Sequence, residues 1–346
     1  MKGLFFVSDG KVDGPFFKGE QVTSFLQLSD RYLAGTVSPF FGPNIRTSTD
    51  GGGSWDEPTG QKVAFPQSSD SSVVQIWQLQ KDNRVQHETV LAGVEPAAMF
   101  WSQNGAESFE LVDTLWDHPH RPEWQPGGGG LGLHTILTHV ERPDRVVVGI
   151  STGGVYRSDD RGRTWAPRNK GISARYLPED DPEFGQCVHK IVIDAEGPDV
   201  FWLQNHWGIY RSTDAGDNWE DVGRPGETGG VTSDFGFPIV AHPSHPGTAF
   251  VFPVESDEFR CSPSGRCLVY RTTDGGNSWE GFGMGLPQSE AYMTVLRDAF
   301  TVGTSPPYPF VFGTRTGQVY ASADCGEHWR VFAEHLPPVL CVRVIT

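Results

Sequence analysis

One eight-residue pattern, S/T-x-D-x-G-x-x-W, recurs five times in this 346-residue chain, and a sixth copy keeps part of it. The clear copies occupy residues 48–55, 158–165, 212–219, 272–279 and 322–329, and the degenerate copy occupies residues 102–109. Successive copies are separated by steps of 50 to 60 residues. A nearly fixed period of this size predicts a repeat architecture in which every unit carries the same turn.

The residue types of the pattern are those of a tight turn between two strands. An Asp satisfies backbone amides one or two residues ahead, and a Gly adopts positive φ without steric cost. Four copies directly follow alternating runs rich in β-branched and aromatic residues, which predict strands. These runs are Val155–Ser158, Ile209–Ser212, Val269–Thr272 and Val319–Ser322. The aspartates are therefore expected to be turn residues that bind no ligand.

The pattern resembles the Asp-box, or BNR repeat, and the resemblance covers nearly the whole chain. It implies an all-β fold, a single β-propeller over residues 1–346, in which each box joins the third and fourth strands of a blade, away from the active face. The two ends of the chain look like fragments of one further blade. Pairing of Val339–Ile345 with Leu4–Val7 would close the propeller with seven blades, and six blades are the alternative.

Charge and composition limit the partners. A net charge of −16 argues against nucleic acid and anionic membranes, because phosphate binding needs a basic surface. The N-terminal apolar run is too short for a signal peptide, so a cytoplasmic location is expected. Of the five cysteines, Cys187 and Cys341 are expected to be buried thiols. Cys261 and Cys267 are spaced so that they could pair, but a reducing compartment favours thiols.

The strand order divides the loops between two faces. Innermost strands are expected at residues 134–139, 189–194, 237–242 and 293–298, each followed by a second strand such as residues 145–149 or 200–203. The long loops that lead into them, at about residues 56–72, 110–131, 166–186 and 220–236, then share one face. Long loops on a rigid scaffold are where function usually lies.

Three histidines are candidates for a metal site on this face. His134 and His189 begin equivalent innermost strands, and His206 lies in a loop of the same blade as His189. Three imidazoles with an open fourth position suit zinc, copper or iron. Alternatively, the histidines bind substrate or are hydrogen-bonded structural residues.

Other polar and aromatic residues on this face suggest carbohydrate chemistry. Asp234, Glu255 and Asp257 are the catalytic candidates, since glycoside hydrolysis needs two carboxylates. Arg260 and Arg315 are candidates for an anionic group, although they could equally pair with nearby acids. Trp207 and Tyr292 could stack on sugar rings.

Comparison with families that share the Asp-box argues against some activities. Sialidases share the Asp-box but carry an Arg-Ile-Pro segment that this chain lacks, so sialidase activity is doubtful. Xyloglucanase propellers have boxes similar to Gly208–Gly216, but they use two propellers in tandem. The chain looks most like bacterial BNR-repeat proteins described as glycosyl hydrolase-like, on segments such as residues 185–190, 204–206, 233–238 and 336–340. Three hypotheses follow: a hydrolase-like enzyme acting on a small carbohydrate or glycoconjugate, a non-catalytic ligand- or protein-binding propeller, and a metal-dependent enzyme.

Overall fold

The computed structural model describes residues 3–8, 10–57, 60–85, 88–179 and 181–345. Asp9 and the terminal Thr346 lie outside these ranges. Two compact units are present: a first unit of Met1–Phe6 and Asp13–Pro167, and a second unit of Val7–Val12 and Arg168–Thr346. No helix within the described ranges is long and apolar enough to span a membrane.

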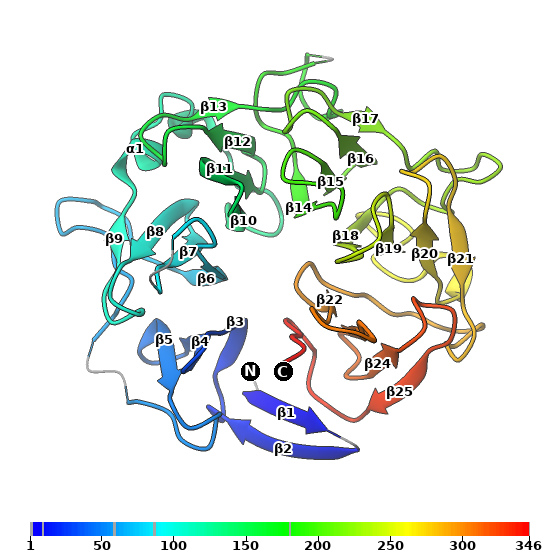
Figure 1. Cartoon of the computed structure of the whole chain (residues 1–346), viewed down its shortest axis with the longest axis horizontal. Helices are drawn as coiled ribbons and strands as arrows, with labels where there is room; N and C mark the ends of the chain where they lie inside the picture. The colour runs from blue at the N-terminus through cyan, green and yellow to red at the C-terminus, as the bar shows by residue number, and fades with distance from the viewer. Residues whose placement is uncertain (1–2, 9, 58–59, 86–87, 180, 346) are drawn as a thin grey trace. The chain divides into compact units, whose positions relative to one another are not determined.

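The first unit contains three antiparallel meander sheets (Figure 1). Their strands are β3 (Gln21–Gln27), β4 (Tyr32–Ser38) and β5 (Gly42–Ser48); β6 (Gln75–Lys81), β7 (Val90–Glu95), β8 (Ala98–Ser102) and β9 (Glu110–Leu111); and β10 (Leu133–His139), β11 (Arg142–Ile150), β12 (Gly154–Ser158) and β13 (Ala166–Pro167). The connection between β9 and β10 holds the short helices α1 (Asp113–Trp116) and η1 (Arg121–Glu123). Each sheet has the strand order of a propeller blade.

The second unit contains three four-stranded sheets of the same order. Their strands are β14 (Val188–Ile193), β15 (Phe201–Asn205), β16 (Ile209–Ser212) and β17 (Glu220–Asp221); β18 (Gly236–Ala241), β19 (Ala249–Pro253), β20 (Val269–Thr272) and β21 (Glu280–Phe282); and β22 (Phe300–Val302), β23 (Phe310–Gly313), β24 (Val319–Ser322) and β25 (Arg330–Ala333). The short helix η2 (Pro263–Gly265) lies between β19 and β20. All four strands expected directly before boxes are confirmed.

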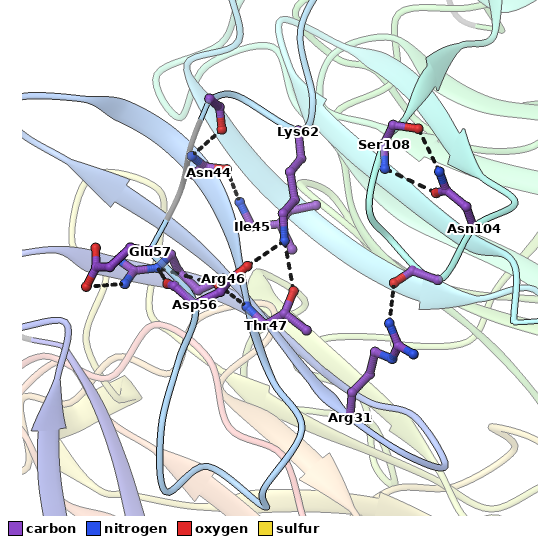
Figure 2. Close-up of polar contacts among 12 residues, drawn as sticks. Arg31, Asn44, Ile45, Arg46, Thr47, Asp56, Glu57, Lys62, Asn104 and Ser108 are labelled. Carbon is purple, nitrogen blue, oxygen red and sulfur yellow. Dashed lines mark hydrogen bonds and ion pairs between the residues drawn. The ribbon is translucent and has the colours of Figure 1, made fainter.

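The boxes are self-contained turns, as expected. In the box of residues 212–219, Asp214 Oδ1 accepts the Asn218 amide at 2.9 Å, four residues ahead rather than one or two. The Ser212 hydroxyl donates to the same oxygen at 2.8 Å and accepts the Gly216 amide at 2.9 Å. The degenerate copy keeps this geometry with a neutral side chain, because Asn104 Oδ1 accepts the Ser108 amide at 3.1 Å (Figure 2).

Box tryptophans join consecutive sheets. Within the second unit, the indole of Trp279 is 5% exposed and donates to the Val222 carbonyl at 2.8 Å. Gly285 shows how close this packing is: its φ is +82°, and a Cβ atom there would lie 1.8 Å from the Trp329 carbonyl oxygen. Between the sheets, aromatic side chains such as Phe250 and Phe310 pack with ring centroids 4.3 Å apart. Each such fully buried ring contributes roughly 1.5–3 kcal/mol of hydrophobic stabilisation.

A long connection in the first unit is held against the strand that precedes it. Figure 2 shows Lys62 donating to the Asp56 carboxylate and the Thr47 hydroxyl, at 2.8 and 2.9 Å. Arg46 of β5 donates to the Asp56 carbonyl at 2.7 Å. These bonds fix residues 56 and 62 at the start of the loop that leads to β6.

Two expectations, about a strand and about two cysteines, are corrected. The innermost strand of the last sheet is β22, Phe300–Val302, rather than residues 293–298. Cys187 and Cys341 are half-buried rather than buried, whereas Cys261 and Cys267 are free thiols, as expected. In the described residues β1 (Leu4–Ser8) pairs with β2 (Lys11–Phe16), and Cys341 makes a parallel bridge to Asp298, with the Val342 amide donating to the Asp298 carbonyl at 2.8 Å. Pairing of the two chain ends with each other stays a prediction.

Candidate functional site

Innermost strands carry a repeated irregularity at their first residues. The register of β14 with β15 skips one residue between Val188 and Lys190, so His189 occupies a bulge. The same skip occurs at Thr23 in β3, Trp77 in β6 and His134 in β10. Bulges re-aim a side chain out of the regular alternation. The equivalence of His134 and His189 expected from the sequence is therefore seen in the strand register.

The bulge of β14 fixes the tautomer of His189. Its Nδ1 lies 2.6 Å from the carbonyl oxygen of Gly236, the first residue of β18. A carbonyl only accepts, so Nδ1 carries the proton and Nε2 keeps its lone pair. The Thr23 hydroxyl makes the matching bond in the first unit, donating to the Ile76 carbonyl at 2.7 Å. A bond from a bulge side chain to the next innermost strand is therefore made in both units.

A histidine and a cysteine complete a cluster with His189. Cys187 is two residues before His189, and its Sγ lies 3.7 Å from His189 Nε2. His206, in the β15–β16 connection, is placed by a bond from its amide to the Cys187 carbonyl at 3.0 Å. The His189 and His206 ring centroids are 5.6 Å apart. One potential ligand atom from each of the three residues lies within 4.8 Å of the other two.

The surroundings of the cluster are aromatic and favour neutral imidazoles. Phe237 stacks on His189 at 5.0 Å, and Phe235 contacts the His206 ring edge-on at 4.8 Å. Burial lowers the pKa of His189 well below its usual range, and Arg297 adds to the effect. Burial also lowers the pKa of His206, and this outweighs the opposite effect of its hydrogen bond with Asp257.

The catalytic candidates lie in two loops around His206. Asp257 Oδ2 accepts a hydrogen bond from His206 Nε2 at 3.2 Å. Asp234, between β17 and β18, is half-buried, and burial raises its pKa although Arg175 and His206 lower it. Glu255 lines a cavity of about 390 Å³ together with Ser233, Ser264, Arg266 and Tyr270. Its carboxylate accepts the Ser264 amide at 3.4 Å.

Of the four expected binding residues, Trp207 contacts His206, and Arg260 lies near Phe237. Trp207 lies against the His206 ring at 4.4 Å and against Tyr176 at 5.1 Å. Arg260 is exposed, and its guanidinium lies 5.6 Å from the Phe237 ring centre. Tyr292 is 59% exposed and contacts Phe259 at 6.4 Å. Arg315 is also exposed, with its amide bonded to the Thr294 carbonyl at 3.0 Å.

His134 has a different environment from its counterpart. It belongs to the first unit, is fully buried, and its Nδ1 lies 3.1 Å from the Thr135 hydroxyl. In the second unit, the third residue of the cluster with His189 and His206 is Cys187. The sequence had indicated only a buried thiol at this position. The missed signal was the closeness of Cys187 to His189 in the sequence, two residues before it at the start of the strand.

A second group of metal-binding residue types is geometrically unsuitable. His242, His245 and Cys325 have potential ligand atoms within 4.8 Å of one another. However, the two imidazoles are stacked, with centroids 3.9 Å apart and planes inclined by only 9°. A metal ion lies in the plane of an imidazole that binds it, so two parallel stacked rings cannot both point their lone pairs at one ion.

No family model matches the chain. Over 158 residues, which are 43% of this chain, the sequence is 26% identical to xyloglucanase Xgh74A of Acetivibrio thermocellus, and the match covers 18% of that protein.

Several solved structures are similar over most of the chain. The GH74 xyloglucanase of Xanthomonas campestris has a TM-score of 0.61 at 18% identity, covering 90% of this chain and 45% of that one. An ancestral GH74 enzyme has a TM-score of 0.59 at 16% identity, covering 88% and 36%. YCF48 of Cyanidioschyzon merolae has a TM-score of 0.56 at 12% identity, covering 92% and 86%. The chain thus spans less than half the length of these two GH74 proteins. The likenesses confirm the all-β propeller fold, with six sheets of blade type described and seven blades still allowed.

Proposed function

We propose that this chain, a β-propeller related to the propellers of GH74 xyloglucanases and to YCF48, binds a carbohydrate at the loops around His206 and hydrolyses it. The observation that supports the proposal is the pair of carboxylates beside one imidazole. Asp257 is hydrogen-bonded to His206, and Asp234 interacts electrostatically with the same ring. Two carboxylates in different environments are what glycoside hydrolysis requires.

The two carboxylates have different surroundings and therefore different roles. Asp234 is half-buried, which favours its protonated form and suits a general acid for the leaving sugar oxygen. The side chain of Asp257 is 51% exposed and is oriented by His206. A carboxylate held in one orientation suits the base or nucleophile. Trp207, half-buried beside His206, offers a ring face on which a sugar can stack.

The test uses xyloglucan oligosaccharides and a panel of other β-glucan oligosaccharides, with reducing-end release measured alongside calorimetric binding. Asp234→Asn and Asp257→Asn should each lower kcat by about a hundredfold or more, with binding retained. Asp221→Asn is the matched control for the first variant, since burial also raises the pKa of Asp221. Glu258→Gln, an exposed neighbour, is the control for the second.

Two results would overturn the proposal in different ways. Wild-type protein that binds an oligosaccharide without cleaving it supports the non-catalytic ligand-binding alternative. Wild-type protein that neither binds nor cleaves any oligosaccharide of the panel excludes the carbohydrate assignment. Equal losses of kcat in the Asp221→Asn control would show that Asp234 acts through the fold rather than on the substrate.

A further inference from the structure

We propose that Cys187, His189 and His206 bind one Zn²⁺ ion, with a fourth coordination position left open. This site goes beyond the proposed hydrolysis, which needs only the two carboxylates. It is carried by three residues of the second unit whose potential ligand atoms lie within 4.8 Å of one another. Thiolate and imidazole are the ligand types that zinc prefers, and three protein ligands with one open position are typical of catalytic zinc sites.

Hydrogen bonds present the correct nitrogen of each imidazole. His189 donates from Nδ1 to the Gly236 carbonyl at 2.6 Å, so its lone pair is on Nε2, the atom that faces Cys187 Sγ. His206 Nε2 lies 3.2 Å from the Asp257 carboxylate, to which it donates. Its lone pair is then on Nδ1. Metal-binding histidines almost always donate their other N–H to a carbonyl or carboxylate, as both rings do here.

The separations are close to those of an assembled site. Ligands of tetrahedral zinc at 2.0–2.3 Å from the ion are about 3.3–3.8 Å apart. Sγ of Cys187 and Nε2 of His189 are 3.7 Å apart, within this range. His206 completes the site by a side-chain adjustment of about 1 Å, since its potential ligand atom lies within 4.8 Å of those of the other two residues.

Backbone bonds hold the ligands in place. The His206 amide donates to the Cys187 carbonyl at 3.0 Å. This bond connects the loop that carries His206 directly to Cys187. Phe235 contacts both imidazoles edge-on, and Phe237 stacks on His189. When Zn²⁺ binds, a Zn–S bond forms, and the Cys187 thiol releases one proton to solvent.

Calorimetric titration of the metal-free full chain with Zn²⁺ tests the proposal, together with proton release measured in buffers of different ionisation enthalpy. Co²⁺ serves as a second probe, because a thiolate–cobalt charge-transfer band reports directly on the cysteine. Wild-type protein should bind one ion per chain with thiolate coordination. Cys187→Ser and His206→Gln should each weaken binding by at least tenfold, and Asp257→Asn by about 10–100-fold.

His189 allows a variant that separates binding from folding. In His189→Thr the hydroxyl can make the bond to the Gly236 carbonyl that Thr23 makes to Ile76 in the first unit, but no ligand nitrogen remains. This variant should fold, as judged by its far-UV circular dichroism and Tm, and should lose stoichiometric zinc binding.

Matched controls are Cys261→Ser, which removes another half-buried thiol, and His335→Gln, which removes an exposed imidazole. Both should bind zinc as wild type does. Absence of binding by wild-type protein at tenfold excess zinc would overturn the proposal. So would equal losses in the control variants, or loss of binding in His245→Gln with retention in Cys187→Ser, which would place the ion at the other cluster. Zinc binding that persists without any glycan hydrolysis would leave this proposal standing and count only against the proposed enzyme.

Discussion

The ion cluster around Asp298 gives the sharpest test of how the site is held together. Asp298 is buried, and its carboxylate accepts bonds from Lys190 Nζ at 2.8 Å and Arg343 Nη2 at 3.0 Å. Lys190 follows His189 in β14, and Asp298 follows Arg297, whose guanidinium lies 5.9 Å from the Phe237 ring centre. The cluster therefore connects β14, which carries His189, to the segment of Arg297 beside Phe237.

Asp298→Asn should be strongly destabilising. Burial alone would raise the pKa of Asp298, but Lys190 and Arg343 outweigh burial, and the pKa is lowered. The carboxylate thus stabilises the fold above about pH 4, where it is charged in both states, and the contribution is lost as the pH falls through the lowered value. The variant weakens two charge-assisted hydrogen bonds, each of which contributes about 1.5–3 kcal/mol. It also leaves the cations of Lys190 and Arg343 close together without a compensating negative charge. We expect a loss of about 3–5 kcal/mol at pH 7.

Urea unfolding of four proteins measures this coupling: wild type, Asp298→Asn, Lys190→Met and the double variant. The double variant should be about 1–2 kcal/mol more stable than Asp298→Asn, because removing Lys190 relieves the repulsion between cations. Asp144→Asn is the exposed control, since its partner Arg161 is 65% exposed and the pair should contribute about 1 kcal/mol or less.

Two outcomes would refute the reasoning. A loss below about 1 kcal/mol in Asp298→Asn would mean that this carboxylate behaves like the exposed control. Additive effects in the double variant would mean that Lys190 and Asp298 do not interact energetically, despite the 2.8 Å distance.

Three further predictions concern the boxes and a buried hydroxyl. Asp214→Ala should cost about 1–2 kcal/mol in urea unfolding, because it removes the bonds within its turn, and should leave ligand binding unchanged. Hydrogen bonds from the hydroxyl four residues on chiefly lower the pKa of Asp50 and Asp160 from 3.8 to about 2, so the Tm should fall as the pH drops from about 4 to about 2. Tyr210→Phe removes a 2.6 Å bond to the Trp207 carbonyl; we expect a loss of about 1 kcal/mol and weaker carbohydrate binding by calorimetry.

The fold could be predicted from the sequence because each repeat is defined by interactions between residues close together in the chain. Box turns satisfy their own amides, and the strands before them alternate, so both can be recognised within eight residues. The last sheet was placed less accurately. Residues 293–298 alternate as a strand should, but their bonding is irregular: Thr294 pairs with Arg315, and Asp298 pairs with the C-terminal segment. Such pairing depends on tertiary contacts that no local pattern encodes.

The site could be predicted only in part for the same reason. The strand start at His189 and the loop of His206 were recognisable from the repeat, and the structure brings these two together. The bond from His206 to Asp257 joins residues 51 apart, and its geometry depends on how the β19–β20 loop is held. That loop, between Pro253 and Val269, is longer than the corresponding connections of the neighbouring repeats. The period therefore predicts the face on which Asp257 lies, but not the bond that its side chain makes.

A structural bond of the repeat creates the chemistry of this site. In β3 the bulge residue is Thr23, whose hydroxyl oxygen donates to the Ile76 carbonyl and is the only polar atom of its side chain. In β14 the same position holds His189, whose Nδ1 makes the corresponding bond to Gly236. An imidazole has a nitrogen beyond the one that this bond uses, and its tautomer is set by the bond itself. A single change of residue type at a scaffold position therefore leaves the packing bond intact and presents a lone pair to Cys187 and His206.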